Sequence, residues 1–129
     1  TYTADRLVGL EIRPEEADRA RRNVGTIDPE GRAEILGEDG IEWLRRFDGT
    51  IDLLYLDADG PAGIGKSIYL KMVQAAEPVL RPGSLVLAHN SVNAAASLAD
   101  YLAYMRDPAN FRESVNMIID DQGLEVSQR

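Results

Sequence analysis

The sequence predicts a single α/β domain with a mostly parallel, three-layer sheet and an antiparallel pair of strands at its edge. Short apolar runs alternate with segments whose apolar residues recur at helical spacing. The run Ile51–Asp59 is almost continuously apolar before it ends in two carboxylates, which is typical of a buried parallel strand. Near the C-terminus, two short apolar segments flank Asp120-Asp121-Gln122-Gly123, which predicts a hairpin.

The first half of the chain contains two strand and helix pairs. Leu7–Ile12 is apolar except for Glu11, and Pro14 with the two acids after it suits the first turn of a helix. Gly25 is a typical residue just beyond a helix end. The predicted elements are a strand over Leu7–Ile12, a helix ending near Asn23, a strand over Ala33–Leu36 and a helix over Glu38–Arg46.

The second half continues the alternation and closes with the hairpin. Gly60–Gly65 contains three glycines and a proline and predicts a loop, and Arg81-Pro82-Gly83 predicts the end of the helix that follows it. The predicted elements are a strand from Ile51, a helix over Ser67–Leu80, a strand over Ser84–Ala88, a helix over Ala94–Met105, and strands over Ser114–Ile119 and Leu124–Ser127.

Composition narrows the function. At 129 residues, 44% hydrophobic and 28% charged, the chain is long enough for one core and one domain. A net charge of -8 argues against a nucleic-acid partner, and the absence of cysteine excludes disulfides, thiolate zinc sites and a cysteine nucleophile. No apolar run approaches the roughly 18 residues of a membrane span, and no signal pattern is present. We therefore expect a cytoplasmic protein without membrane or nucleic-acid partners.

The two acids after the Ile51 strand mark the expected site. In an open parallel sheet, ligands bind just beyond the carboxyl ends of the strands, so Asp57 and Asp59 are predicted to lie where chemistry takes place. A buried carboxylate without a partner is costly, and a strand end is where water, a metal or a ligand can supply one.

Five short motifs occur in order along the chain: Leu-Glu-Ile at 10 to 12, Glu-Asp-Gly at 38 to 40, Leu-Asp-Ala-Asp at 56 to 59, Leu-Arg-Pro-Gly at 80 to 83 and Ala-His-Asn at 88 to 90. Together they resemble the class I S-adenosylmethionine-dependent O-methyltransferases, in particular the catechol and caffeoyl-CoA branch. The resemblance implies a Rossmann-like methyltransferase fold, S-adenosylmethionine as cofactor and a small hydroxylated molecule as substrate.

The resemblance implies that five residues contact the cofactor: Glu11, Ile12, Asp39, Gly40 and Asp57. Glu11, at the tip of the first strand, is also suited on physical grounds to accept hydrogen bonds from a ribose diol. The alternative is a solvated glutamate at a strand end. Asp39 could accept from the adenine amine, or it could be an ordinary helix N-cap, and the two interpretations are compatible.

Asp57 and Asn90 match positions that hold a divalent cation in the family, and oxygen ligands suit Mg²⁺. The family has an aspartate directly before that asparagine, whereas this chain has His89, its only histidine. Imidazole suits Mn²⁺ better than Mg²⁺, so one hypothesis is a metal bound by Asp57, His89 and Asn90. A second is that no metal binds and His89 deprotonates the substrate, since an imidazole with a pKa near about 6.5 exchanges protons around neutrality. A third is a histidine merely satisfied by hydrogen bonds at a strand end.

A second departure concerns the family's catalytic lysine, whose position after Asp-Ala-Asp is occupied here by Gly60. Lys66 lies six residues further along and could fold back to the site as a catalytic residue, or could face solvent. Gly60 to Ser67 also satisfies the phosphate-binding pattern G-x-x-x-x-G-K-S. Bound phosphates, however, would meet like charge from Asp57 and Asp59.

The glycine-rich first motif of the family does not occur in the chain. We therefore expect a partial methyltransferase domain over residues 1–129 that lacks its first, central strand, with a complementary chain or a homodimer as possible partners. The predicted function is methyl transfer to a hydroxyl of a small molecule. The alternatives are a nucleotide phosphotransferase with a phosphate-binding loop and a non-catalytic nucleotide-binding or assembly module.

Overall fold

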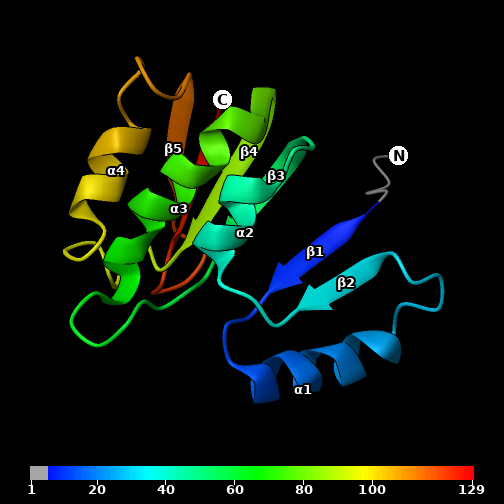
Figure 1. The fold of residues 1–129 in the computed structure, drawn as a ribbon. Coiled ribbons are helices and arrows are strands. Elements are labelled where there is room, and N and C mark those ends of the chain that lie inside the picture. The colour runs from blue at the N-terminus through cyan, green and yellow to red at the C-terminus, as the bar shows by residue number, and fades with distance from the viewer. Residues whose placement is uncertain (1–5) are drawn as a thin grey trace. The chain divides into compact units, whose positions relative to one another are not determined.

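The computed structural model describes residues 6–129 and divides the chain into two compact units, one up to Arg46 and one over Phe47–Arg129. Figure 1 shows the elements along the chain. Each unit is described by itself, and the prediction of one domain over residues 1–129 stays a prediction. None of the helices in residues 6–129 combines the length and apolar character needed to cross a membrane.

The first unit is a parallel strand pair joined by a helix. Strands β1 (Leu7–Leu10) and β2 (Ala33–Leu36) pair in parallel, with α1 (Pro14–Gly25) as the connection and α2 (Gly40–Arg46) after β2. Pro14 occupies the first turn of α1, as predicted, because its missing N–H group would have no partner there. Gly25 is the last residue of α1 and does not lie beyond it, since the helix continues to a cap at Thr26.

The second unit contains a four-stranded sheet in the order β3-β4-β6-β5, formed by β3 (Ile51–Leu56), β4 (Leu80–His89), β5 (Glu113–Met117) and β6 (Leu124–Gln128). Strands β3 and β4 are parallel, whereas β6 is antiparallel to both of its neighbours. The predicted parallel strands and the C-terminal antiparallel hairpin are thus confirmed.

Two helices cover one face of this sheet. Helices α3 (Ile68–Ala76) and α4 (Ala99–Met105) share a buried core with the β3 and β4 side chains that point toward them (Figure 1). The rings of Tyr69 and Tyr101 meet edge to face inside this core, with centroids 5.7 Å apart. The members of the core are Leu56, Tyr69, Val73, Val86, Ala88, Leu98, Tyr101, Leu102, Met105 and Phe111.

The prediction that the Ile51 strand is buried is correct for one face only. Leu56 points toward the helices and is 3% exposed, whereas Leu53 and Tyr55 are 54% and 52% exposed. Successive side chains of a strand point to opposite faces, and α3 and α4 cover only the face that carries Leu56.

Two helix predictions are too long. The helix expected over Ser67–Leu80 ends at Ala76, because Pro78 lies in a short 3₁₀ turn (Glu77–Val79) and β4 begins at Leu80. The helix expected from Ala94 begins at Ala99, since the residues before it form a series of turns.

Candidate functional site

The register of β3 and β4 brings Asp57 next to His89. Leu56 pairs with Ala88, so the residue after each comes to the same carboxyl end of the two parallel strands. Nδ1 of His89 lies 3.3 Å from Oδ1 of Asp57, although the geometry falls short of a normal hydrogen bond. Nδ1 is buried and has no hydrogen-bond partner among the described residues. The imidazole edge that carries Nδ1 is therefore directed at a carboxylate.

Lys66 returns to the same strand end. Its Nζ lies 3.0 Å from Oδ1 of Asp57 and 3.7 Å from Oδ2 of Asp59, and its side chain is only 14% exposed. The ammonium group also lies 5.5 Å from the ring centroid of Tyr69, within the range of a cation–π interaction. Lys66 is therefore not a solvated surface lysine but part of the site.

The glycine-rich loop explains how Lys66 arrives there. The Gly60 N–H donates to the Gly65 carbonyl over 3.0 Å and closes the loop on itself. A Cβ at position 60 would lie 2.9 Å from the Ile64 side chain and 3.2 Å from the Gly65 carbonyl, so this close approach requires glycine. Gly60 thus permits the turn that brings Lys66 to the strand end.

The charges at the strand end act on one another. Burial alone would raise the pKa of Asp57, but the hydrogen bond from Lys66, the contact with His89 and the electrostatic attraction of both groups outweigh it and lower that pKa. Burial raises the pKa of Tyr69, and the nearby charges of Asp57 and Asp59 raise it further. The site therefore holds an ionised carboxylate beside a neutral phenol.

The side chain of Asn90 is hydrogen-bonded to the turns that follow β4 and precede β6. Its backbone is left-handed, with φ of 67°, and its Nδ2 donates to Oδ1 of Asn93 and to Oε1 of Gln122, each over 3.1 Å. In residues 6–129, no group of three or more His, Cys, Asp or Glu side chains could hold a metal ion. Because Nζ of Lys66 lies 3.0 Å from Oδ1 of Asp57, the residues as arranged do not fit a divalent cation. The role of Asn90 as a ligand stays a prediction.

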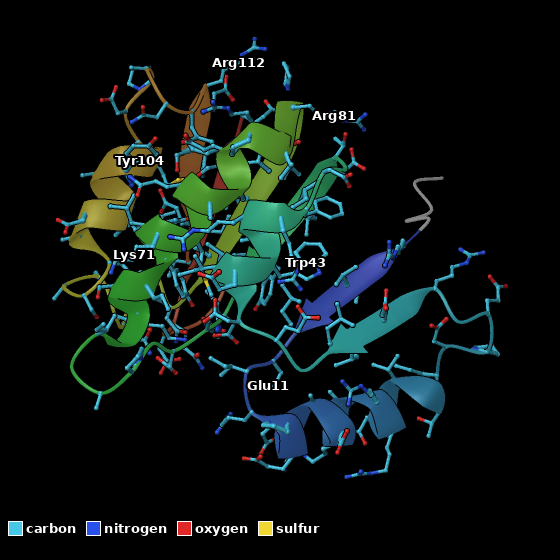
Figure 2. The ribbon with its side chains drawn as sticks, viewed as in Figure 1. Glu11, Trp43, Lys71, Arg81, Tyr104 and Arg112 are labelled. Atoms are coloured by element: carbon cyan, nitrogen blue, oxygen red, sulfur yellow. The ribbon has the colours of Figure 1, made fainter. Side chains whose placement is uncertain are left out.

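The predicted cofactor contacts of the first unit lie at the carboxyl end of its strand pair. Glu11 follows β1 directly (Figure 2), and its backbone N–H donates to the Leu36 carbonyl at the end of β2. Its Oε1 accepts from the backbone N–H of Arg13 over 2.9 Å and from Nε over 3.3 Å. Ile12, the next residue, is 63% exposed.

Asp39 is the N-cap of α2. Its Oδ1 accepts from the backbone N–H groups of Ile41 and Glu42, each over 2.9 Å, and Gly40 is the first helical residue. The N-cap interpretation is therefore confirmed, while a contact with adenine stays a prediction. Two carboxylate acceptors at the ends of parallel strands suit a ligand with hydroxyl and amine donors, which is the fit that a nucleoside requires.

The Gly60 to Ser67 segment is not arranged as a phosphate-binding loop. Its backbone N–H groups at Gly60, Gly65 and Ser67 donate to carbonyls within the loop, whereas a phosphate cradle needs them free to face the ligand. Lys66 is directed at carboxylates. The structure gives no support to the nucleotide phosphotransferase alternative.

Two residues that contact the predicted site residues are not evident from the sequence motifs. Tyr69 supplies the aromatic ring beside Lys66. It comes three residues after Lys66, which is about one helical turn, and this spacing could have indicated the contact. Gln122 in the hairpin turn holds the Asn90 amide. No local pattern relates Gln122 to a residue so distant in the sequence.

A family described as a methyltransferase domain matches residues 2–91. This match covers most of the chain, and the chain belongs to that methyltransferase family. The predicted resemblance is thus confirmed. A search of curated proteins found no match.

The chain is also similar to solved methyltransferase structures. These include cofactor-bound Rv0187 from MTB, at 20% identity and a TM-score of 0.81, covering 95% of this chain and 61% of that one. The SAH-bound Podospora anserina methyltransferase PaMTH1 is 15% identical with a TM-score of 0.78, covering 95% and 60%. The O-methyltransferase from Bacillus cereus in complex with SAH is 18% identical with a TM-score of 0.75, covering 96% and 63%. These likenesses show the Rossmann-like methyltransferase fold, and the chain spans about 60% of the length of those proteins.

Proposed function

We propose that this protein catalyses S-adenosylmethionine-dependent methylation of a hydroxyl group on a small molecule. The family match and the likeness to SAH-bound structures support the cofactor. The observation that carries the proposal is the cluster of Asp57, Lys66 and His89 at the carboxyl ends of β3 and β4. It combines an ionised carboxylate, a fixed positive charge and a group that can take a proton.

In this proposal the first unit holds the nucleoside. Glu11 accepts from the ribose hydroxyls and Asp39 from the adenine amine, with Ile12 and Gly40 beside them. The support is their place at the ends of the parallel pair β1 and β2, where open α/β sheets bind nucleotides. Asp57, predicted as a further cofactor contact, lies at the corresponding end of β3.

Bound S-adenosylmethionine supplies an electrophilic methyl group on a positively charged sulfur. The residues of the chain have to align the attacking oxygen and remove its proton. Because Nδ1 of His89 faces Asp57, its Nε2 is the nitrogen that accepts the substrate proton. Asp57 then stabilises the imidazolium that forms. Methyl transfer would form the oxygen–methyl bond as the sulfur–methyl bond of the cofactor breaks, and the proton on His89 passes to solvent.

Lys66 contributes its charge to this step. Its ammonium group lies against Asp57, where it favours the negative charge that develops on the substrate oxygen as the proton leaves. Our proposal involves no metal ion, because the described residues do not fit one.

Titration calorimetry on the full-length protein tests the class of ligand. We expect S-adenosylhomocysteine to bind with one site per chain and ATP not to bind. ATP binding alone would replace the proposal with a phosphotransferase, and binding of neither ligand would favour a non-catalytic module. Transfer of a labelled methyl group from S-adenosylmethionine to a panel of catechols and other small hydroxylated compounds then tests the reaction itself.

A further inference from the structure

We propose that the ammonium group of Lys66 takes the place of a divalent cation at the strand end, so that the site keeps metal ions out and supplies its positive charge from the chain. This inference concerns the same site as the proposed function. Its consequence for catalysis rests on that proposed function. Whether a metal ion binds is a separate question, which can be answered without any turnover.

The first support is position. A cation at this site would have to bind the carboxylate that follows β3, and Lys66 Nζ already lies 3.0 Å from Oδ1 of Asp57. It also lies 3.7 Å from Oδ2 of Asp59, so one positive charge is shared between the two acids of the strand end. A divalent ion that bound the same oxygens would lie beside this ammonium group and be repelled by it.

The second support is that Lys66 is held in place. Its side chain is 14% exposed, compared with 45% for Asp57 and 72% for Asp59, so the lysine is the most enclosed side chain of the three. The Tyr69 ring lies beside the ammonium group, and the hydrogen bond from Gly60 to Gly65 fixes the loop that carries it. A lysine that merely balanced surface charge would extend into solvent, because holding a long side chain still costs conformational entropy.

Binding of Mn²⁺ to the full-length protein, followed by the electron paramagnetic resonance signal of the free ion, tests the inference directly. We expect no binding at millimolar Mn²⁺ to the wild type, to Lys66→Arg, which keeps the charge, or to Lys71→Met, which removes a lysine from the exposed surface of α3 (Figure 2). Lys66→Met should bind about one Mn²⁺ per chain, and Lys66→Met combined with Asp57→Asn should lose it again. Circular dichroism establishes that each variant is folded.

Two results would overturn the inference. One is Mn²⁺ binding to the wild type that Asp57→Asn abolishes, which would mean that a metal displaces Lys66. The other is a folded Lys66→Met variant that binds no Mn²⁺, which would mean that something other than Lys66 keeps the ion out. Neither result depends on the methyl donor, so a failure here is distinguishable from a failure to bind S-adenosylhomocysteine.

Discussion

The ammonium group of Lys66 lies 3.0 Å from Oδ1 of Asp57, although the two residues are nine positions apart in the sequence, with a loop of three glycines between them. Because His89 lies 3.3 Å from the same oxygen, one carboxylate oxygen faces both basic groups of the site. This oxygen organises the charge at the ends of β3 and β4. The chemical roles that we assign to Lys66 and His89 both depend on it.

Replacing His89 tests the general base. We expect His89→Ala to lower kcat by about 10²- to 10⁴-fold, the range that general base catalysis contributes, while S-adenosylhomocysteine still binds with wild-type affinity. Steady-state kinetics and calorimetry on the full-length protein provide the two readouts. Asn93→Ala, a change on the neighbouring turn, should leave kcat within about twofold. An unchanged kcat in His89→Ala would rule out a catalytic role for the imidazole.

The acid stability of the protein should depend on Asp57. Its pKa is lower in the folded state than the value of about 3.9 for an unfolded aspartate, so the folded state favours the ionised form. The resulting stabilisation is fully present above the unfolded pKa and is lost as pH falls through the folded one. Between about pH 5 and pH 2, the free energy of unfolding should therefore fall less steeply in Asp57→Asn than in the wild type. Urea titrations at each pH measure this free energy. An equal fall with pH in the variant and in the wild type would contradict the expectation.

The meeting of Asp57 and His89 was predictable from the sequence, whereas the contact of Lys66 was not. Asp57 and His89 each directly follow an apolar run, and neighbouring parallel strands have their carboxyl ends at the same edge of a sheet. The place of Lys66 depends instead on the hydrogen bond between Gly60 and Gly65, a property of the folded loop that no residue pattern specifies.

The orientation of Asn90 could not be predicted either, for a related reason. Its left-handed backbone and its bond to Gln122 depend on the packing of the hairpin turn against residues 90–93. Strand positions were easier to predict than helix lengths. Apolar alternation locates a strand directly, while the alanine-rich periodicity from Ala94 continues through turns that are not helical.

The hairpin turn should be sensitive to a side chain at Gly123. Gly123 has φ of 75°, and a Cβ there would lie 2.4 Å from Cγ2 of Val92. Gly83 is a matched control, because its φ is 94° but nothing lies within 4 Å of an added Cβ. We expect Gly83→Ala to cost about 1–2 kcal/mol for the left-handed backbone alone, and Gly123→Ala about 1–3 kcal/mol more for the clash. If chemical denaturation gave the same loss in the free energy of unfolding for both variants, the Val92 side chain would move aside without cost.

Alkaline stability should depend on the buried phenol of Tyr101. The hydroxyl has no hydrogen-bond partner among the described residues, and burial, together with the charge of Glu125, raises the pKa of Tyr101. Because the folded pKa lies above the unfolded value of about 10, the contribution to stability is full below that pH and is lost as pH rises. Tyr101→Phe should therefore unfold less readily than the wild type above about pH 10.

The same substitution should cost little at pH 7. Removing a buried hydroxyl that lacks a partner relieves its desolvation penalty, so we expect the free energy of unfolding to stay the same or to rise by about 1 kcal/mol. Thermal unfolding at pH 7 and at pH 11 provides the comparison. A large loss of stability at pH 7 would mean that the hydroxyl has a partner after all, such as an internal water molecule.

The ion pair between Arg106 and Glu125 carries the strongest stability prediction. Glu125 is 0% exposed and accepts two hydrogen bonds from Arg106, over 2.7 and 2.8 Å, and one from Ser114 over 2.7 Å. The hydroxyl of Ser114 also lies 2.7 Å from that of Ser127. A buried carboxylate with these partners is satisfied, and its cost appears only when the cation is removed.

Arg106→Met should therefore lower the free energy of unfolding by about 3–5 kcal/mol, because it leaves the Glu125 charge buried with only a hydroxyl donor. Arg112→Met, at an exposed position near the start of β5 (Figure 2), should change it by less than about 0.5 kcal/mol. Combining Arg106→Met with Glu125→Gln should restore most of the loss, since a neutral amide keeps a hydrogen bond to Ser114 without a buried charge. Urea unfolding with an unchanged slope measures all three differences. If the double variant were as unstable as Arg106→Met alone, lost packing of the arginine side chain, and not the orphaned charge, would be the cause.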